Sequence, residues 1–329
     1  MDGDHKAGEH GDGRLAGRLR ELTGGRFPVA AALVGPDGTT TASVGAGLGA
    51  DYEIGSVSKG VTGLLYADAL ARGEVTARTA LGELLPLADA PAGGVTLGAL
   101  ATHRSGLPRV PASARPWRRT YALWRHGTNP YGESVAELLD QARAVRPGPP
   151  RPRYSNLGFE LLGHALAAAA GRPYERLVAD RVSTPLGLER FYLPTGPAGL
   201  LPGALAGTTR RGRPREPWTG EALGPAGGIR ADIAGMARLT AALLDGTAPG
   251  IAALDPVLPF TAGTRIGAAW ITLSVRNLTL TLHNGGTGGF RSWLGLDRAS
   301  GTGVVVLAAT TADVDRHGFA LLTAPAPRA

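Results

Sequence analysis

Stretches typical of β-strands occur only towards the two ends of this 329-residue chain. Apolar runs bounded by turn residues predict a hairpin over residues 28–44 and four strands between residues 267 and 309. No strand is evident between residues 75 and 185, where apolar residues recur at helical spacing. This distribution predicts one discontinuous domain that contains the strands and one helical domain inserted into it.

The spacing of apolar residues along the chain predicts the bounds of the helices and of the two domains. Helical periodicity predicts helices over residues 14–22, 56–71, 95–102, 133–145, 157–170, 174–182 and 231–244, with a last helix after residue 313. The predicted fold class is α/β (α+β): residues 1–72 and 225–329 form an antiparallel sheet flanked by helices, and residues 73–224 form an all-helical insertion. We expect residues 1–12 to be disordered and the Pro-, Gly- and Arg-rich residues 190–226 to form a loop.

Charge and cysteine content exclude several classes of protein. The net charge of +7 raises nucleic acid as a partner, but no zinc-finger spacing, RNP-like strand, basic zipper or P-loop supports it. We interpret the two basic clusters as solvated loops, with attraction of an anionic substrate as the alternative. The clusters are Arg115, Arg118 and Arg119 beside Trp117, and Arg210, Arg211, Arg213 and Arg215. The absence of cysteine excludes disulfides, thiolate catalysis and cysteine-based metal sites.

The start of the sequence bears on location. Residues 1–11 are polar and lack the apolar segment of a signal peptide. No apolar run reaches the roughly 18 residues of a transmembrane helix. The sequence therefore predicts a cytoplasmic protein with no membrane partner.

Lysine is almost absent from the chain. Only Lys6 and Lys59 occur, among a total of 34 lysines and arginines. Arginine stays protonated, whereas a lysine that is partly desolvated or near other positive charge can lose its proton and act as a base. A lysine at position 59 therefore suggests that this residue takes part in catalysis as a base.

Lys59 ends the sequence Ser56-Val57-Ser58-Lys59. On a helix, a spacing of three residues places Ser56 and Lys59 on one face, so the lysine can accept the serine proton. If Ser56 begins the helix, the helix dipole also favours negative charge developing there. About 0.07 such matches arise by chance in this composition. The alternative interpretation makes Ser56 a helix cap and Lys59 a solvated residue of the first turn.

Two further motifs lie far from Ser56 in the sequence. Tyr154-Ser155-Asn156 directly precedes the helix expected at residues 157–170, and residues 283–290 (HNGGTGGF) follow a predicted strand. Glycines allow a backbone to approach a substrate closely and offer N–H groups to an oxyanion. Taken separately, the tyrosine also suits a core position and the glycines a hairpin turn.

In this order, the three motifs resemble the serine β-lactamase/penicillin-binding-protein superfamily, whose signatures include S-x-x-K. The sequence is most similar to its class C branch, which comprises class C β-lactamases, family VIII esterases, DD-peptidases, D-aminopeptidases and related acyltransferases. The similarity covers residues 28–310, including VTLGALATHRSGLP at 95–108, PLGL at 185–188, GGIR at 227–230 and GFRS at 289–292. It implies the same fold, with the active site in the cleft between the two domains.

The resemblance also implies catalytic roles. Ser56 is then the acylated nucleophile and Lys59 its immediate proton acceptor. Tyr154 works with Lys59, as a base in acylation and as an acid to the leaving group. We expect the nearby Lys59 to lower the pKa of the Tyr154 phenol from its ordinary value of about 10.

The remaining motif residues are expected to bind the substrate. The resemblance implies that Asn156 positions the acyl side chain and hydrogen-bonds Lys59. It places the oxyanion hole at the N–H groups of Ser56 and Gly286, next to the triplet His283-Asn284-Gly285.

Three positions depart from the family pattern. His283 stands where β-lactamases and DD-peptidases carry lysine, Gly235 replaces a helix-start aspartate whose capping role Asp232 can take, and residues 205–209 lack a tyrosine. Histidine has an ordinary pKa of about 6.5 and is mostly neutral at pH 7. We therefore expect poor turnover of β-lactams, a preference for uncharged esters or amides, and a preference for anionic substrates that grows as the pH falls. Two alternatives are that Arg291 binds a substrate carboxylate and that His283 only packs at a strand end.

The other histidines are weaker candidates for catalysis or metal binding. A Ser-His triad requires His103 near Ser56, but the resemblance marks the stretch around His103 as structural. No histidine has carboxylate partners at ligand spacing, so we expect neither a metal nor another cofactor.

Together these features predict a serine acyl-enzyme hydrolase that acts on a small-molecule ester or amide. One alternative is an acyl or amide transferase of secondary metabolism, in which an amine or alcohol acceptor replaces water. Further alternatives are a D-aminopeptidase, a DD-peptidase, a β-lactamase, and a non-catalytic binding module on the same fold. The sequence indicates no oligomeric state, and the missing signal peptide argues against peptidoglycan as substrate.

Overall fold

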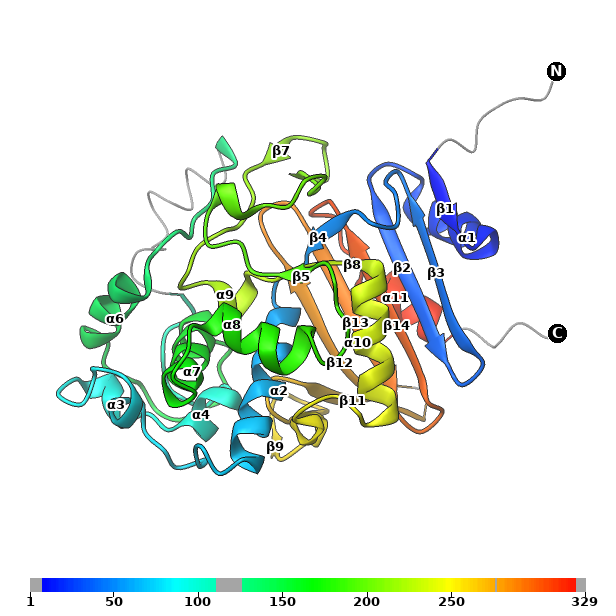
Figure 1. Cartoon of the computed structure of the whole chain (residues 1–329). Coiled ribbons are helices and arrows are strands. Elements are labelled where there is room, and N and C mark those ends of the chain that lie inside the picture. The colour runs from blue at the N-terminus through cyan, green and yellow to red at the C-terminus, as the bar shows by residue number, and fades with distance from the viewer. Residues whose placement is uncertain (1–7, 111–125, 276, 324–329) are drawn as a thin grey trace, which may run out of the picture.

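A nine-stranded antiparallel sheet joins the two ends of the chain (Figure 1). The computed structural model describes residues 8–110, 126–275 and 277–323. The strand order is β1-β3-β2-β14-β13-β12-β11-β10-β9, so that β2 (Val29–Gly35) pairs with β14 (Thr302–Ala308). The other strands are β1 (Glu9–Gly11), β3 (Gly38–Val44), β9 (Leu258–Pro259), β10 (Thr264–Ile266), β11 (Ile271–Val275), β12 (Leu278–Gly286) and β13 (Arg291–Asp297).

Helices cover both faces of this sheet. The helices are α1 (Gly13–Thr23), α2 (Val57–Ala71), α3 (Leu81–Leu84), α4 (Leu97–Ala101), α6 (Val135–Arg143), α7 (Asn156–Ala169), α8 (Tyr174–Val178), α9 (Gly224–Gly227), α10 (Ile233–Asp245) and α11 (Asp315–Leu322). Successive residues of a strand point to opposite faces. Ala30 and Ala32 of β2 therefore join one core with α2 and α10, whereas Val29 and Ala31 join a second core with α1 and α11.

The helices of the central segment pack beside the sheet rather than on it. Figure 1 shows α3, α4, α6, α7 and α8 grouped together at the left, away from β2 and β3. α7 is the centre of this group because it is buried on nearly all sides and contacts α2, α4 and α9. In the part of the chain that the structure describes, no helix combines the length and the apolar character needed to cross a membrane.

Several local predictions are confirmed. The hairpin predicted over residues 28–44 is β2 and β3, and the helix predicted over residues 14–22 is α1. Asp232 caps α10, since its Oδ1 accepts a hydrogen bond of 2.7 Å from the Gly235 N–H. The capping role expected of Asp232 is thus present.

Two expectations differ from the structure. Disorder was expected for residues 1–12, but Glu9–Gly11 pairs with β3 at the sheet edge and Asp12 caps α1 through the Leu15 N–H. That prediction is wrong for residues 9–12, because backbone pairing with an open edge needs no apolar pattern; residues 1–7 lie outside the described part.

The insertion is also not purely helical. The expected loop over residues 190–226 contains β5 (Phe191–Tyr192), β6 (Gly207–Thr208) and β7 (Pro214–Arg215). Each of these strands has only two residues, which is too short to show an alternating pattern.

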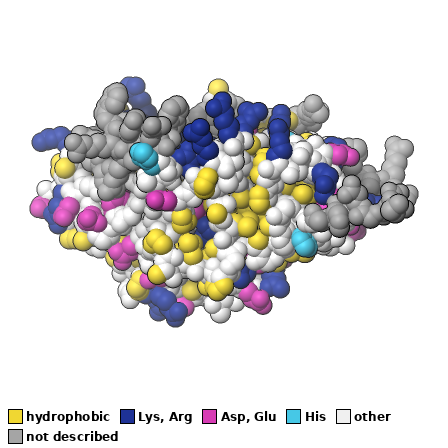
Figure 2. Space-filling view, turned by 90° about the horizontal axis from the view of Figure 1, so that it is seen from above, with side chains coloured by type: hydrophobic (Ala, Val, Ile, Leu, Met, Phe, Trp, Pro, Cys, Tyr) yellow, Lys and Arg dark blue, Asp and Glu magenta, His cyan; other side chains and the backbone are white. Residues whose placement is uncertain are grey.

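The basic cluster around β7 is largely in solvent. Arg210, Arg211 and Arg213 are exposed, as expected for a solvated loop, while Arg215 is half-buried. Seen from above, several Lys and Arg side chains gather along the upper edge of the view, near the middle of that edge (Figure 2). The other basic cluster, with Arg115, Arg118 and Arg119, lies outside the described residues.

A buried ion-pair network lies directly before the predicted nucleophile. β4 (Asp51–Glu53), β8 (Arg230–Asp232) and β5 form a small sheet in the order β4-β8-β5. The fully buried Arg230 lies 2.7 Å from the Asp51 carboxylate and 3.2 Å from the Glu53 carboxylate. Because residues 54–56 directly follow β4, this network holds in place the backbone that leads to Ser56.

We expect Arg230→Met to lower the free energy of unfolding by about 3–5 kcal/mol, because it leaves two buried carboxylates without their cation. Urea denaturation followed by circular dichroism measures the loss. Arg298→Met is the control, since Arg298 and Asp255 form an exposed pair at 2.9 Å and such pairs contribute about 1 kcal/mol or less. Equal losses in the two variants would contradict this account of the buried network.

Candidate active site

Ser56 occupies the N-cap position of α2, the helix that carries Lys59, but its side chain makes no capping hydrogen bond. The Lys59 N–H donates to the Ser56 carbonyl at 2.9 Å, which forms the first turn. On this turn the Lys59 Nζ lies 3.1 Å from the Ser56 Oγ. The pairing predicted from the S-x-x-K spacing is therefore formed.

The Lys59 amine is enclosed by protein. Its side chain is fully buried, and its Nζ donates to the Ala226 carbonyl of α9 at 2.5 Å. The same Nζ lies 4.9 Å from the centroid of the Tyr154 ring. This burial is incompatible with the alternative interpretation of Lys59 as a solvated first-turn residue.

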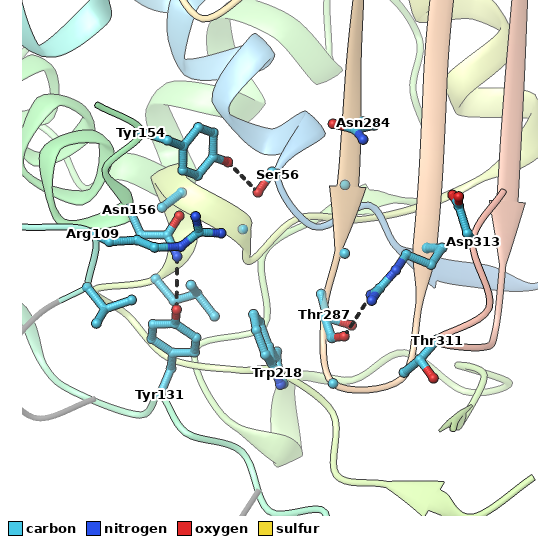
Figure 3. Close-up of a pocket in the computed structure, with 18 of the residues that line it drawn as sticks. Ser56, Arg109, Tyr131, Tyr154, Asn156, Trp218, Asn284, Thr287, Thr311 and Asp313 are labelled. Carbon is cyan, nitrogen blue, oxygen red and sulfur yellow. Dashed lines mark hydrogen bonds between the residues drawn. The ribbon is translucent and has the colours of Figure 1, made fainter. Parts of the chain in front are cut away.

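Tyr154 completes the arrangement from another part of the chain. It precedes α7, whose cap is Ser155. The Tyr154 hydroxyl donates to the Ser56 Oγ at 2.6 Å (Figure 3). The serine oxygen is thus held by an amine and a phenol, which are both groups that can exchange protons with it.

The glycine-rich end of β12 lies against the backbone that leads into Ser56. A Cβ on Gly285 would lie 2.9 Å from the Ser56 nitrogen, and one on Gly55 would lie 2.7 Å from the Gly286 nitrogen. Gly55 also has a φ of +50°, which favours glycine. Glycine at these positions therefore lets the backbone at Ser56 and the backbone at Gly286 approach closely, as the expected oxyanion hole requires.

Asn156 makes a different contact from the one expected. Its Nδ2 donates to the Tyr131 hydroxyl at 3.0 Å, and its Oδ1 is buried without a hydrogen-bond partner among the described residues. The predicted hydrogen bond to Lys59 is therefore wrong in this structure. Asn156 nevertheless lines the same cavity as Ser56 and Tyr154.

His283 lies behind the site rather than in its wall. Burial and the nearby Lys59 lower its pKa to about 4. Its Nδ1 lies 2.8 Å from the Asn284 carbonyl oxygen, and its ring meets Trp270 edge-on. This placement agrees with the alternative in which His283 packs at a strand end, and no charge appears there between pH 5.5 and 8.5.

His103 contacts Tyr154 and its two chain neighbours, and it does not form the Ser-His pair with Ser56 that a triad requires. His103 has a φ of +54°, unusual for a side chain other than glycine. Its carbonyl accepts from the Arg153 N–H at 2.8 Å and its Nδ1 accepts from the Ser155 N–H at 3.2 Å. Its ring also packs on the Tyr154 ring, with centroids 4.5 Å apart. His103 thus holds the residues on both sides of Tyr154 and is a positioning residue.

Ser56, Tyr154 and Asn156 line one cavity of about 970 Å³. Asn284, Gly285 and Gly286, which the sequence analysis expects to bind the substrate, also line it. Sequence reasoning missed other lining residues, among them Arg109, Tyr131, Trp218, Asp313 and Asp315. Only Arg109 had a signal in the sequence, because it directly follows the SGLP stretch. Among the described residues, no group of three or more His, Asp and Glu side chains is placed to hold a metal ion.

The comparison with known proteins agrees with this geometry. The family model for β-lactamase matches residues 15–323. The chain belongs to the β-lactamase family. In fold it is similar to a class C β-lactamase from Rhodobacter sphaeroides, with a TM-score of 0.78, 20% identity, and coverage of 94% of this chain and 97% of that one. A β-lactamase/D-alanine carboxypeptidase from Pseudomonas syringae gives a TM-score of 0.78 at 16% identity, covering 93% and 95%.

Curated relatives of this β-lactamase-family chain match over shorter stretches. The D-alanyl-D-alanine-carboxypeptidase/endopeptidase AmpH of Escherichia coli K12 is 35% identical over 102 residues, which are 31% of this chain and 25% of AmpH. A β-lactamase-like protein of Homo sapiens is 35% identical over 163 residues, which are 49% of this chain and 30% of that protein. The matched regions thus span a third or less of these relatives.

If His103 positions Tyr154, its effect must disappear when the phenol is absent. We expect His103→Gly, which suits a positive φ, to lower kcat about 10- to 100-fold with little change in KM. His103→Asn, which retains an acceptor and tolerates this backbone conformation, recovers part of the loss. In a Tyr154→Phe background, His103→Gly has little further effect. The same loss in both backgrounds would show that His103 only stabilises the fold.

The lowered pKa of His283 predicts a stability loss in acid. Between pH 6.5 and 4 the unfolded chain binds a proton at this residue and the folded chain does not, so stability falls as the pH falls. At pH 4.5 the loss at His283 is about 2 kcal/mol relative to pH 7.5. His283→Asn removes this contribution, which is measured by urea denaturation at both pH values. Parallel losses in the variant and the wild type would contradict the prediction.

Proposed function

We propose that the chain is a serine hydrolase that forms an acyl-enzyme with an ester or amide of a small molecule. The observation that carries the proposal is the Ser56 Oγ, which Lys59 and Tyr154 approach to 3.1 Å and 2.6 Å beside a cavity of about 970 Å³. A nucleophile paired with proton-transfer groups at such distances is typical of covalent catalysis.

Acylation follows from the positions of these three groups. The Ser56 Oγ attacks the substrate carbonyl carbon while its proton passes to the Lys59 amine. The carbonyl oxygen gains charge and accepts hydrogen bonds from the N–H groups of Ser56 and Gly286. The Tyr154 hydroxyl then gives its proton to the leaving oxygen or nitrogen as the acyl bond breaks. Proton transfer from Lys59 to Tyr154 returns both groups to their starting forms.

Deacylation uses the same groups in reverse. A water molecule attacks the acyl carbon and loses its proton to the Lys59–Tyr154 pair, and the Ser56 Oγ leaves as it regains a proton. The names of the relatives, β-lactamase and D-alanine carboxypeptidase, both describe acyl transfer to water. They support this class of reaction, while the ester or amide itself rests on our proposal.

An acyl or amide transferase remains the second candidate because of one wall of the cavity. The carboxylates of Asp313 and Asp315 line it on the side of α11. Their negative charge suits an amine acceptor that arrives as an ammonium ion. Adding amines during ester turnover tests this candidate, since a transferase converts the acyl group to an amide faster than to the free acid.

The same wall and the neutral His283 disfavour β-lactams. A penicillin carboxylate finds no cationic side chain at position 283 and meets the carboxylates of Asp313 and Asp315 nearby. We therefore propose that β-lactam hydrolysis is weak compared with ester hydrolysis.

The decisive experiment uses Ser56→Ala with Ser58→Ala as its matched control. Wild type is expected to release a burst of 4-nitrophenol from 4-nitrophenyl butyrate and to gain the butyryl mass at Ser56. Ser56→Ala loses both signals. Ser58→Ala retains them, because Ser58 is buried and its Oγ accepts a hydrogen bond from the Ile229 N–H at 3.3 Å. An adduct on another residue would refute the assignment of the nucleophile, and no adduct in wild type would favour a binding module.

A further inference from the structure

The two walls of the cavity differ in how their positive charge is compensated. On the sheet side, Arg291 donates to the Thr287 carbonyl at 3.2 Å and to the Phe290 carbonyl at 3.0 Å. The carboxylates of Asp313 and Asp315 also act on its charge. The cation of this wall is therefore already satisfied by protein groups.

On the helical side, Arg109 has no such compensation. Within the described part of the chain its guanidinium makes no hydrogen bond or ion pair. Its one interaction there is with the face of Tyr154, whose ring centroid lies 5.4 Å from the guanidinium carbon. Figure 3 shows the Arg109 side chain extending into the cavity, across from Asp313, with Ser56 between the two walls.

The backbone that carries Arg109 is fixed to the catalytic motif. The Arg109 carbonyl accepts from the Asn156 N–H at 2.7 Å, and the preceding Pro108 carbonyl accepts from the Ser155 hydroxyl at 2.6 Å. The backbone of Arg109 is therefore held in place next to Tyr154, although the residue is exposed. Holding the backbone reduces the conformational entropy that is lost when the arginine side chain binds a ligand.

The surroundings of Arg109 suit an organic anion. Tyr131 and Trp218 pack with ring centroids 4.8 Å apart and both line the cavity beside it. They offer apolar surface to the carbon skeleton of a ligand, while a guanidinium binds a carboxylate through two parallel hydrogen bonds.

We propose that the substrate of Ser56 carries a carboxylate that Arg109 binds on the helical side of the cavity. This inference rests on the proposed function and adds the charge of its substrate. It replaces the expected preference for uncharged substrates, because that expectation considered only positions 283 and 291. Asp313 and Asp315 repel an anion from the opposite wall, so the carboxylate has one favourable orientation.

Matched esters test the proposal and identify which half of the substrate carries the anion. For the acyl half, the 4-nitrophenyl monoester of adipic acid is compared with its methyl ester. For the leaving half, 4-carboxyphenyl butyrate is compared with 4-carbamoylphenyl butyrate. Wild type is expected to hydrolyse one of the two anionic esters with a kcat/KM about tenfold or more above its neutral partner.

Three arginine variants locate the source of that preference. Arg109→Gln is expected to lower kcat/KM for the preferred anionic ester about 10- to 100-fold and to change the neutral ester less than about threefold. Arg291→Gln retains the preference for the anion. Arg146→Gln controls for net charge, because Arg146 is exposed and outside the cavity.

The results that would overturn this inference differ from those that would overturn the proposed function. If every ester acylates Ser56 but wild type shows no preference for either anion, or if Arg291→Gln and not Arg109→Gln removes it, this inference is overturned and the proposed function stands. If no ester acylates Ser56, the proposed function fails and this inference fails with it.

Discussion

The burial of the Lys59 amine is the constraint on which the rest of the site depends. A buried amine is costly unless hydrogen bonds replace its water. Here the replacements are the Ala226 carbonyl at 2.5 Å and the Ser56 Oγ at 3.1 Å, with the Tyr154 ring at 4.9 Å. These partners come from α9, from the start of α2 and from the segment before α7. The contacts that satisfy the lysine therefore also assemble the catalytic groups.

A second set of buried charges holds the strand that leads to Ser56. Arg230 joins Asp51 and Glu53 of β4, and burial raises the pKa of Glu53 to about 7 despite the arginine. The carbonyl of Ile54, the residue after Glu53, accepts from the Ser292 hydroxyl of β13 at 2.6 Å, which ties this segment to the large sheet. The nucleophile is thus positioned from both sheets, while Tyr154 is positioned from the helical part by His103.

The sequence predicted those features that depend on short spacing or on long apolar patterns. Ser56 and Lys59 are three residues apart on one helix, so their contact follows from helix geometry alone. The hydrogen bond of Asn156 depends instead on Tyr131, whose place relative to α7 is set by tertiary packing. The pKa of His283 likewise depends on burial, which no local pattern reports. Short strands such as β5 were missed because two residues cannot show alternation.

The arrangement of the site offers a physical reason why this chain uses arginine in its ion pairs and lysine at position 59. Arg230 and Arg181 hold their partner carboxylates at 2.7 Å, and these cations need only remain charged. Lys59, in the part of the chain that the structure describes, forms no ion pair with a carboxylate and contacts a serine oxygen, a carbonyl and an aromatic ring. In the proposed reaction this amine takes up the Ser56 proton as Ser56 attacks and later passes a proton to Tyr154. Arginine therefore suffices for static charge throughout the fold, and lysine is needed at the position where a proton must move.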